Sequence, residues 1–404
     1  MSDQEEYYVD SSTTSHSLLS HNGSESKRVL KYPRLKTRLL ILFLVIVICC
    51  TLTWVFFTSH SSVKYEPWFH STEVLQFRNT YPPKEYSLET PSLTYMLQSC
   101  QSGFGSFVNN FLNVFLLALD NNIAFHLQSL DWCYVSWLTF FEDFSSNSQS
   151  PITLDRFNMT GERWRSPSGS FGEIDSPDFN GHIFINHGAD NFQEYRNIWM
   201  KKISDPVLER KRIVAQALWD PKPVIKKVVV DIRKHFVEEQ KKVFISMHIR
   251  RGDKIGLEMG AITTSSYADV LLDIYNTKYS GRNVALFVFS DDDKAVEELR
   301  HLLAEYIDIE IFILSDAFRH VPDLPMEWRP LTQRQGYDQN VYRETDLDNR
   351  YRLTAEIITD MTLAATADEF ICTFSSNIGR LVTLLRNQPL DTVYSLDKPD
   401  WDYD

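Results

Sequence analysis

The 404-residue chain lacks an excess of basic charge. Its 41 lysines and arginines stand against 54 aspartates and glutamates, which gives a net charge of −13. General nucleic-acid binding rests on basic surface, so this balance argues against that class. The chain also lacks the zinc-type motifs Cys-x-x-Cys and His-Glu-x-x-His, a Gly-x-Ser-x-Gly elbow, a Walker loop and any internal repeat. Its 43% hydrophobic content is normal for a globular protein with a core.

An uncharged run near the N-terminus predicts a membrane anchor. Residues 39–58 are long enough to cross a bilayer as a helix, and basic residues are concentrated just before them. The positive-inside rule therefore predicts a cytosolic tail over residues 1–38 and a type II, single-pass protein. The polar composition of the tail predicts that it is disordered. A short stem is expected at residues 59–91, where prolines break regular elements.

The cysteines beyond the anchor are Cys100, Cys133 and Cys372. An oxidising lumen permits a Cys100–Cys133 bridge and leaves Cys372 free in a strand, although spacing alone leaves the pairing open. Asn158 begins an Asn-Met-Thr sequon, which is a candidate glycan acceptor on the lumenal side.

From residue 92 onward the pattern alternates between helix and strand. We expect an N-terminal α/β subdomain at residues 92–240 and a C-terminal one at 241–398. The second should be a Rossmann-like, doubly wound parallel sheet, with a long loop at residues 317–349. The expected strands are 123–127, 182–186, 243–249, 283–290, 309–314 and 369–374, and the expected helices are 107–119, 206–219, 223–236, 266–275, 293–306, 351–365 and 377–385.

Strong polar groups follow the buried strand at residues 243–249. His248, Arg250 and Arg251 stand at its carboxyl end. Ligands of open α/β sheets bind at this edge, and two guanidinium forks suit the oxygens of a diphosphate. The motif therefore predicts a site for an anionic nucleotide, and the alternative is a solvated charge run on a loop.

A second strand end carries Ser375, Ser376 and Asn377, directly before a helix. Two interpretations stay open: an ordinary helix cap, or a helix N-terminus that binds phosphate. The glycines of Gly103-Phe104-Gly105 likewise suit either a turn or a close backbone approach to a phosphate.

Asp291, Asp292 and Asp293 follow a third strand and admit three interpretations. The carboxylates would bind a divalent cation, accept hydrogen bonds from substrate hydroxyls, or cap the next helix.

These motifs together resemble the α1,6-fucosyltransferase family. His248-Ile249-Arg250-Arg251-Gly252-Asp253-Lys254 is similar to its first motif, Asp291-Asp292 to its second and residues 367–377 to its third. The resemblance covers most of residues 95–398, and Asn377 stands where the animal enzymes usually have Gln. It implies a fold with two GT-B-like α/β subdomains in a Golgi membrane protein that uses GDP-fucose as donor, a glycan or glycoprotein as acceptor and no metal or other cofactor.

The resemblance also implies roles for individual residues. Arg250 would be catalytic by binding the donor diphosphate and stabilising the departing GDP, assisted by Ser376 and Asn377. His248 and Asp360 would contact the guanosine. The other expected donor-binding residues are Arg251, Ser375, Gly103, Phe104 and Gly105. Asp291 and Asp292 would bind substrate hydroxyls. Glu258 would be the general base, positioned by Asp253 and Lys254.

The resemblance implies an inverting transfer, α1,6 to the core GlcNAc of N-glycans, and leaves a homodimer open. Two alternatives differ in class. One is a metal-dependent sugar transferase that uses Asp291–Asp293, and the other is a non-catalytic lumenal protein that binds glycans or nucleotides.

Overall fold

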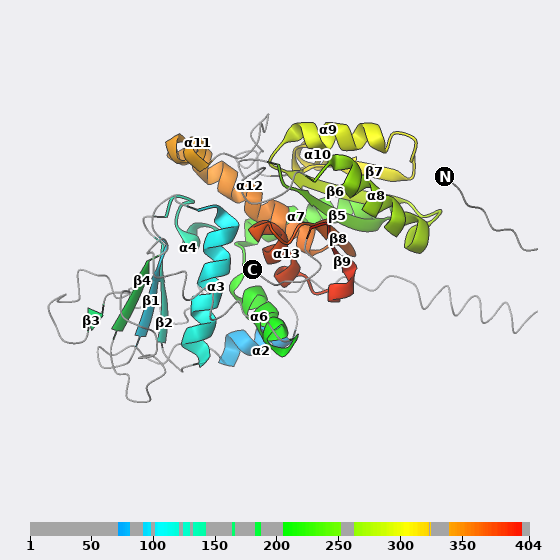
Figure 1. The fold of residues 1–404 in the computed structure, drawn as a ribbon. Helices are drawn as coiled ribbons and strands as arrows, with labels where there is room; N and C mark the ends of the chain where they lie inside the picture. The colour runs from blue at the N-terminus through cyan, green and yellow to red at the C-terminus, as the bar shows by residue number, and fades with distance from the viewer. Residues whose placement is uncertain are drawn as a thin grey trace, which may run out of the picture. The chain divides into compact units, whose positions relative to one another are not determined.

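The structure of the chain is a computed structural model (Figure 1). It describes residues 72–80, 92–97, 102–120, 124–129, 132–142, 164–165, 182–186, 205–251, 262–322, 324 and 339–397. The predicted tail and anchor lie outside these residues. Within them, no helix combines the length and the apolar character that a bilayer crossing needs.

A short helix, α2 (Thr72–Thr80), lies inside the predicted stem. The expectation that prolines would keep the stem free of regular structure is therefore wrong for this segment. Arg78 of α2 donates to the carbonyl of Ala217 at 2.9 Å and forms a 2.8 Å ion pair with Asp220. These contacts fix α2 against the end of the helix that contains Ala217.

The first sheet is parallel throughout, in the order β2-β1-β4-β3. Its strands are β1 (Ser92–Met96), β2 (Ala124–Gln128), β3 (Trp164–Arg165) and β4 (His182–Asn186). Helix α3 (Phe104–Asp120) joins β1 to β2, and its phenylalanines recur at helical spacing on one buried face. They pack on an aromatic cluster that includes Phe125, Trp132, Tyr134 and Trp137.

Three helices follow the first sheet in the chain. They are the single turn α4 (Trp137–Phe140), then α6 (Asp205–Leu218) and α7 (Pro223–Arg233). A π-helical turn, η4 (Lys234–Glu238), extends α7, so the predicted helices at 206–219 and 223–236 are both present.

The second sheet is also parallel, in the order β7-β6-β5-β8-β9. Its strands are β5 (Val243–Ile249), β6 (Val284–Ser290), β7 (Ile309–Phe312), β8 (Glu369–Cys372) and β9 (Val393–Ser395). The chain runs outward from β5 to β7 and then returns to β8 on the other side of β5. The topological switch point, where such sheets bind ligands, therefore lies between β5 and β8.

Alternate residues of β5 face two different layers of helices. Val243, Ile245 and Met247 belong to a core formed with α8 (Thr264–Ile274), its π-helical extension η5 (Tyr275–Tyr279) and α9 (Asp293–Leu302). Phe244 belongs to the other core, and Ser246 donates to the carbonyl of Ala364 at 3.0 Å. The predicted α/β class with a doubly wound parallel sheet is confirmed.

The other layer contains α12 (Leu347–Ala365) and α13 (Asn377–Leu385). The expectation of one long loop at residues 317–349 is wrong at both ends. Helix α10 (Leu314–His320) begins before it, while α11 (Gln339–Glu344) and the first turn of α12 lie within it. A 3-10 turn, η7 (Leu390–Thr392), precedes β9.

The cysteine expectations are met in part. Cys133 forms a disulfide bond, whose partner lies outside the described residues. Cys372, at the end of β8, is a buried free thiol, as predicted. Asn158 also lies outside the described residues.

Candidate functional site

His248 lies near the carboxyl end of β5, and burial keeps its imidazole neutral. The side chain is 4% exposed, and its ring lies 4.7 Å from that of Phe289. Desolvation is the main cause that lowers the pKa of His248 to about 3; the nearby Asp291 charge opposes this shift and the Arg250 charge adds to it. Within the described part of the chain, Nδ1 of His248 has no hydrogen-bond partner. Buried polar atoms are normally satisfied, so Nδ1 suits a contact with a ligand.

Arg250 follows β5 directly and is oriented by Asp291 from the end of β6. The Arg250 guanidinium forms an ion pair with Oδ2 of Asp291, whose Oδ1 accepts the backbone N–H of Arg251 at 2.8 Å. Both side chains of the ion pair are about one-eighth exposed, at 13% and 12%. Asp291 thus holds the carboxyl ends of β5 and β6 together and fixes the direction of one guanidinium.

Arg251 is held by the layer of helices that contains α8 and α9. Its guanidinium pairs with Glu298 of α9 and contacts the hydroxyl of Thr264 at the start of α8. The hydrogen bond from Arg251 is the main cause that lowers the pKa of Glu298. The two arginines adjacent in sequence therefore have different partners, and the fork of Arg251 is already engaged.

Asp291 and Asp292, which follow β6, make different contacts. Asp292 caps α9 by accepting the N–H of Lys294 at 3.1 Å, which supports the capping interpretation at this position. Asp291 is engaged by Arg250 and Arg251 instead. No group of three His, Cys, Asp or Glu residues in the described segments is arranged to hold a metal ion.

The start of α13 lacks the side-chain cap that its sequence suggests. Ser376 is the N-cap residue and is buried, but its side chain makes no capping hydrogen bond. The first-turn N–H groups of a helix have no intrahelical acceptor, so this end suits an anion. Ser375 is arranged differently, because its N–H and hydroxyl both donate to Asp397.

Helix α3 lies against this same helix start. Nδ2 of Asn109 donates to the carbonyl of Asn377 at 2.9 Å and to its Oδ1 at 3.3 Å. A Cβ at Gly105 would lie 2.9 to 3.1 Å from atoms of Asn377 and Ile378, whereas one at Gly103 would meet nothing within 4 Å. Close packing therefore explains the glycine at position 105, because the absence of a side chain lets α3 approach the backbone of α13.

Phe104, between these glycines, is a core residue. It is 2% exposed and lies 5.4 Å from the rings of both Trp132 and Tyr134. The structure thus brings this tripeptide next to Asn377, with the aromatic ring in the hydrophobic core.

Asp360 is buried on α12, one helical turn before Ala364, whose carbonyl accepts the Ser246 hydroxyl. Residues four apart share a helix face, and α12 returns from the carboxyl to the amino edge of the sheet. Asp360 is therefore on the side of the sheet that His248 faces, nearer the carboxyl edge than Ala364.

Part of the predicted site lies outside the described residues. Asp253, Lys254 and Glu258 belong to the segment 252–261, so the proton-transfer group assigned to them stays a prediction. Of the predicted residues, His248 and Arg250 lie at the end of β5, Asp291 follows β6, and Ser376 and Asn377 lie between β8 and α13.

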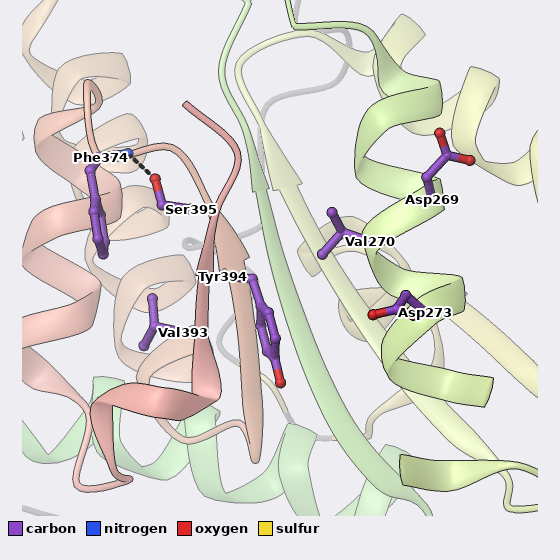
Figure 2. A pocket seen from close by; sticks show the side chains of 7 residues that line it. All are labelled: Asp269, Val270, Asp273, Phe374, Val393, Tyr394 and Ser395. Carbon is purple, nitrogen blue, oxygen red and sulfur yellow. Dashed lines mark hydrogen bonds between the residues drawn. The ribbon is translucent and has the colours of Figure 1, made fainter. Parts of the chain in front are cut away.

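A cavity of about 550 Å³ lies on the other side of β8, between α8 and β9 (Figure 2). Asp269 and Asp273 of α8 line one wall, and Tyr394 and Ser395 of β9 belong to the opposite one. Its lining includes Phe374, which belongs to the third motif, but none of the candidate site residues named in the sequence analysis.

Several residues with structural influence on the site were missed by the motifs. Asn109 and Asp397 contact the start of α13 or the loop before it. Lys211 of α6 is buried and donates to Asn113 at 2.8 Å, and burial together with the Arg380 charge lowers its pKa to about 8. These residues stand apart from every motif in the sequence, and only long-range contacts identify them.

The structure shows an α/β protein in which an arginine and an uncapped helix start follow neighbouring strands of a parallel sheet. No protein-family model matches the chain. Over 142 residues it is 29% identical to the alpha-(1,6)-fucosyltransferase of Drosophila melanogaster, a stretch that makes up 34% of this chain and 19% of that protein. This relative confirms the predicted resemblance to the α1,6-fucosyltransferases, which are a family of glycosyltransferases.

Similar solved structures include a mutant of FUT1 from Arabidopsis thaliana in complex with GDP, at 12% identity and a TM-score of 0.45, with 82% of this chain and 76% of that chain covered. The fucosyltransferase NodZ from Bradyrhizobium has 13% identity and a TM-score of 0.41, with 74% and 92% covered. POFUT1 in complex with GDP-fucose has 12% identity and a TM-score of 0.44, with 78% and 100% covered.

Proposed function

We propose that this protein is a glycosyltransferase that moves fucose from GDP-fucose to a glycan hydroxyl. The observation that carries the proposal is that Arg250 and the buried imidazole of His248 lie at the carboxyl end of β5, while the neighbouring strand β8 leads into the uncapped start of α13. A cationic fork and a helix N-terminus suit a diphosphate, and a neutral buried ring suits a nucleobase or ribose. The similarity to the Drosophila enzyme supports fucose as the transferred sugar.

The proposed mechanism is a direct displacement at the anomeric carbon, which inverts it. As the bond to GDP breaks, negative charge accumulates on the departing diphosphate. Arg250 and the first-turn N–H groups of α13 would stabilise this charge more strongly in the transition state than in bound GDP-fucose. Asp291, by pairing with Arg250, would pre-orient the guanidinium so that little reorganisation accompanies the reaction.

The proton of the attacking hydroxyl needs an acceptor. We assign this role to Glu258, with Asp253 and Lys254 as its positioning residues, on the resemblance alone. Metal independence is also part of the proposal. It is supported by the engagement of two candidate ligands, since Asp291 pairs with Arg250 and Asp292 caps α9.

The acceptor and the cellular setting extend the proposal further. We propose α1,6 transfer to the innermost GlcNAc of an N-glycan, by a type II Golgi membrane protein anchored by residues 39–58. The resemblance of the motifs supports the linkage, and the uncharged run with its basic flank supports the orientation.

Mass spectrometry of a transfer reaction tests donor, acceptor and metal dependence together. The full-length protein is incubated with GDP-fucose and a biantennary N-glycopeptide ending in GlcNAc, with and without EDTA. We expect a gain of one deoxyhexose on the innermost GlcNAc in both conditions, and no product with GDP-mannose.

Other outcomes separate the parts of the proposal. Loss of product in EDTA alone would favour a metal-dependent transferase. GDP-fucose binding without transfer would contradict the acceptor assignment. Absence of GDP-fucose binding would overturn the donor site and favour a non-catalytic binding protein.

A further inference from the structure

The carboxylate of Asp397 binds the loop that joins β8 to α13. Its Oδ1 accepts the N–H of Phe374 at 2.8 Å, and its Oδ2 accepts the N–H of Ser375 at 3.1 Å. The Ser375 hydroxyl also donates to Oδ2. Successive backbone N–H groups that converge on one anion form a nest, and here the chain supplies the anion itself.

Ser395 completes the arrangement from the end of β9. Its Oγ accepts the N–H of Phe374 at 3.1 Å (Figure 2) and lies 2.9 Å from Oδ1 of Asp397. The backbone beside them is fixed to β8, because Ser395 pairs with Cys372 and Leu396 donates to the Cys372 carbonyl at 2.9 Å. We refer to Ser395 and Asp397 as the loop clamp.

On its other side the clamped loop lies against the first turn of α13. The Phe374 carbonyl accepts from Nε of Arg380, and Ser376 donates its N–H to the Thr373 carbonyl at 3.3 Å. A Cβ at Gly379 would lie only 2.4 Å from that same carbonyl oxygen. With this close packing, a shift of the loop would move the first turn of α13.

We propose that Asp397 is a positioning residue for the diphosphate site. By accepting the N–H groups of Phe374 and Ser375, it fixes the loop and leaves the uncapped first turn of α13 as the end that receives the diphosphate. This inference rests on the proposed function. It adds a role for a residue that lies outside the three motifs.

Asp397→Asn is the sharpest variant, because each carboxylate oxygen accepts a different backbone N–H. An amide has one oxygen, so either orientation of Asn places its NH₂ group against an N–H donor. We expect the affinity for GDP, measured by calorimetry on the full-length protein, to fall at least tenfold. Exchange of the Phe374 and Ser375 amides should become faster in the ligand-free protein.

Asp391→Asn is the matched control, because it removes an exposed acid from the turn just before β9. It should leave GDP affinity and amide exchange unchanged. Ser375→Ala removes only the hydroxyl and retains both hydrogen bonds from backbone N–H groups to Asp397, so its loss of affinity should be about threefold or less. If Asp397→Asn does not fold, the Ser375→Ala/Ser395→Ala pair replaces it, with an expected loss of threefold or more.

The two proposals fail in different ways. Wild-type protein that does not bind GDP would overturn the proposed function and the positioning role built on it. Wild-type binding with equal affinity in Asp397→Asn, or in the double serine variant, would overturn the positioning role alone. Unchanged amide exchange in Asp397→Asn would likewise overturn it, whatever the ligand.

Discussion

At the end of β5, burial and charge act differently on neighbouring side chains. His248 lies within the sheet and loses its charge, whereas Arg250 lies just beyond it and keeps a carboxylate partner. Burial thus keeps the imidazole of His248 neutral, while the ion pair with Asp291 fixes the orientation of the Arg250 guanidinium two residues later. Both results are consistent with the proposed nucleotide site.

Replacement of Arg250 by Lys tests the oriented fork. Lysine preserves the positive charge near Asp291 but presents a single ammonium instead of paired N–H donors. We expect kcat/KM for GDP-fucose to fall about 100-fold, a loss typical of one transition-state donor. The measurement is steady-state kinetics with urea unfolding as the check on stability.

Arg300→Lys is the matched control for the arginine substitution. Arg300 forms a 2.7 Å ion pair with Asp316 on the partly exposed surface of α9. Its replacement should leave the kinetics unchanged. Equal kinetics in Arg250→Lys and the wild type would contradict the role assigned to Arg250.

The buried imidazole of His248 predicts a specific loss of stability in acid. Its pKa is about 3 in the folded protein and about 6.5 in the unfolded chain, so only the unfolded chain gains a proton between these values. The stability that His248 contributes is therefore complete above pH 6.5 and is lost as the pH falls toward 3. Between pH 7 and pH 5 this amounts to about 2 kcal/mol.

The measurement compares the free energy of unfolding in urea at pH 7 and pH 5 for wild type and His248→Gln. The variant should lose about 2 kcal/mol less than the wild type over this interval. His301→Gln, which removes an exposed imidazole from α9, controls for loss of a histidine as such. The same pH dependence in wild type and His248→Gln would contradict the neutral, buried assignment.

Among the elements, the junction of α3 with α13 determines the shape of the site. Asn109 binds the first residue of α13, and Gly105 provides the space for that approach. The junction joins a helix of the first sheet to a helix of the second, at the helix start that we assign to the diphosphate.

Gly105→Ala should separate these two helices. Its new Cβ would lie about 3 Å from backbone atoms of Asn377 and Ile378, which cannot move away as a side-chain end can. Overpacking of this kind costs about 1–3 kcal/mol, which urea unfolding would measure. GDP affinity should fall in parallel, because the start of α13 moves.

Gly103→Ala provides the comparison within the same turn. A Cβ at Gly103 meets no atom within 4 Å, so stability should change by less than about 0.5 kcal/mol. Similar losses from both substitutions would show that backbone freedom, rather than close packing, explains the glycines.

The predicted bounds of helices and strands are most accurate where the element is long and its apolar residues are strongly periodic. The strands β5 and β6 and the helix α13 have strong patterns, and their predicted bounds agree within one residue. β1 follows Pro91 directly, and β9 has three residues, so neither has enough pattern to identify it alone. Both become strands because a neighbour in the sheet supplies the hydrogen bonds.

For the whole molecule, one hydrophobic core extends across both sheets. It contains Leu93 and Phe111 from the first sheet and its helix, and Phe287 and Phe370 from the second sheet. Trp219, just after α6, also donates to Thr362 of α12 at 3.0 Å. Residues 65–404 form one compact unit by their contacts, while the predicted boundary at 240 stays a prediction.

This shared core predicts that both sheets unfold together. Trp132 and Trp137 are buried near the first sheet and report on it by fluorescence. Amide exchange in β5 and β6 reports on the second. The two urea midpoints should coincide, whereas clearly separated midpoints would show two independently stable subdomains.

The sequence by itself determined the α/β class, the strand ends that carry His248 and Arg250, and the resemblance to fucosyltransferases. These depend on local patterns: apolar periodicity specifies an element, and a polar residue after a strand lies at its carboxyl end. Only the tertiary structure decided that Asp291 orients Arg250, that Arg251 turns to Glu298, and that Asn109 and Asp397 fix the start of α13. Such pairs lie far apart in the chain, and no local pattern records which distant residues the packing of helices on a sheet brings within hydrogen-bond distance.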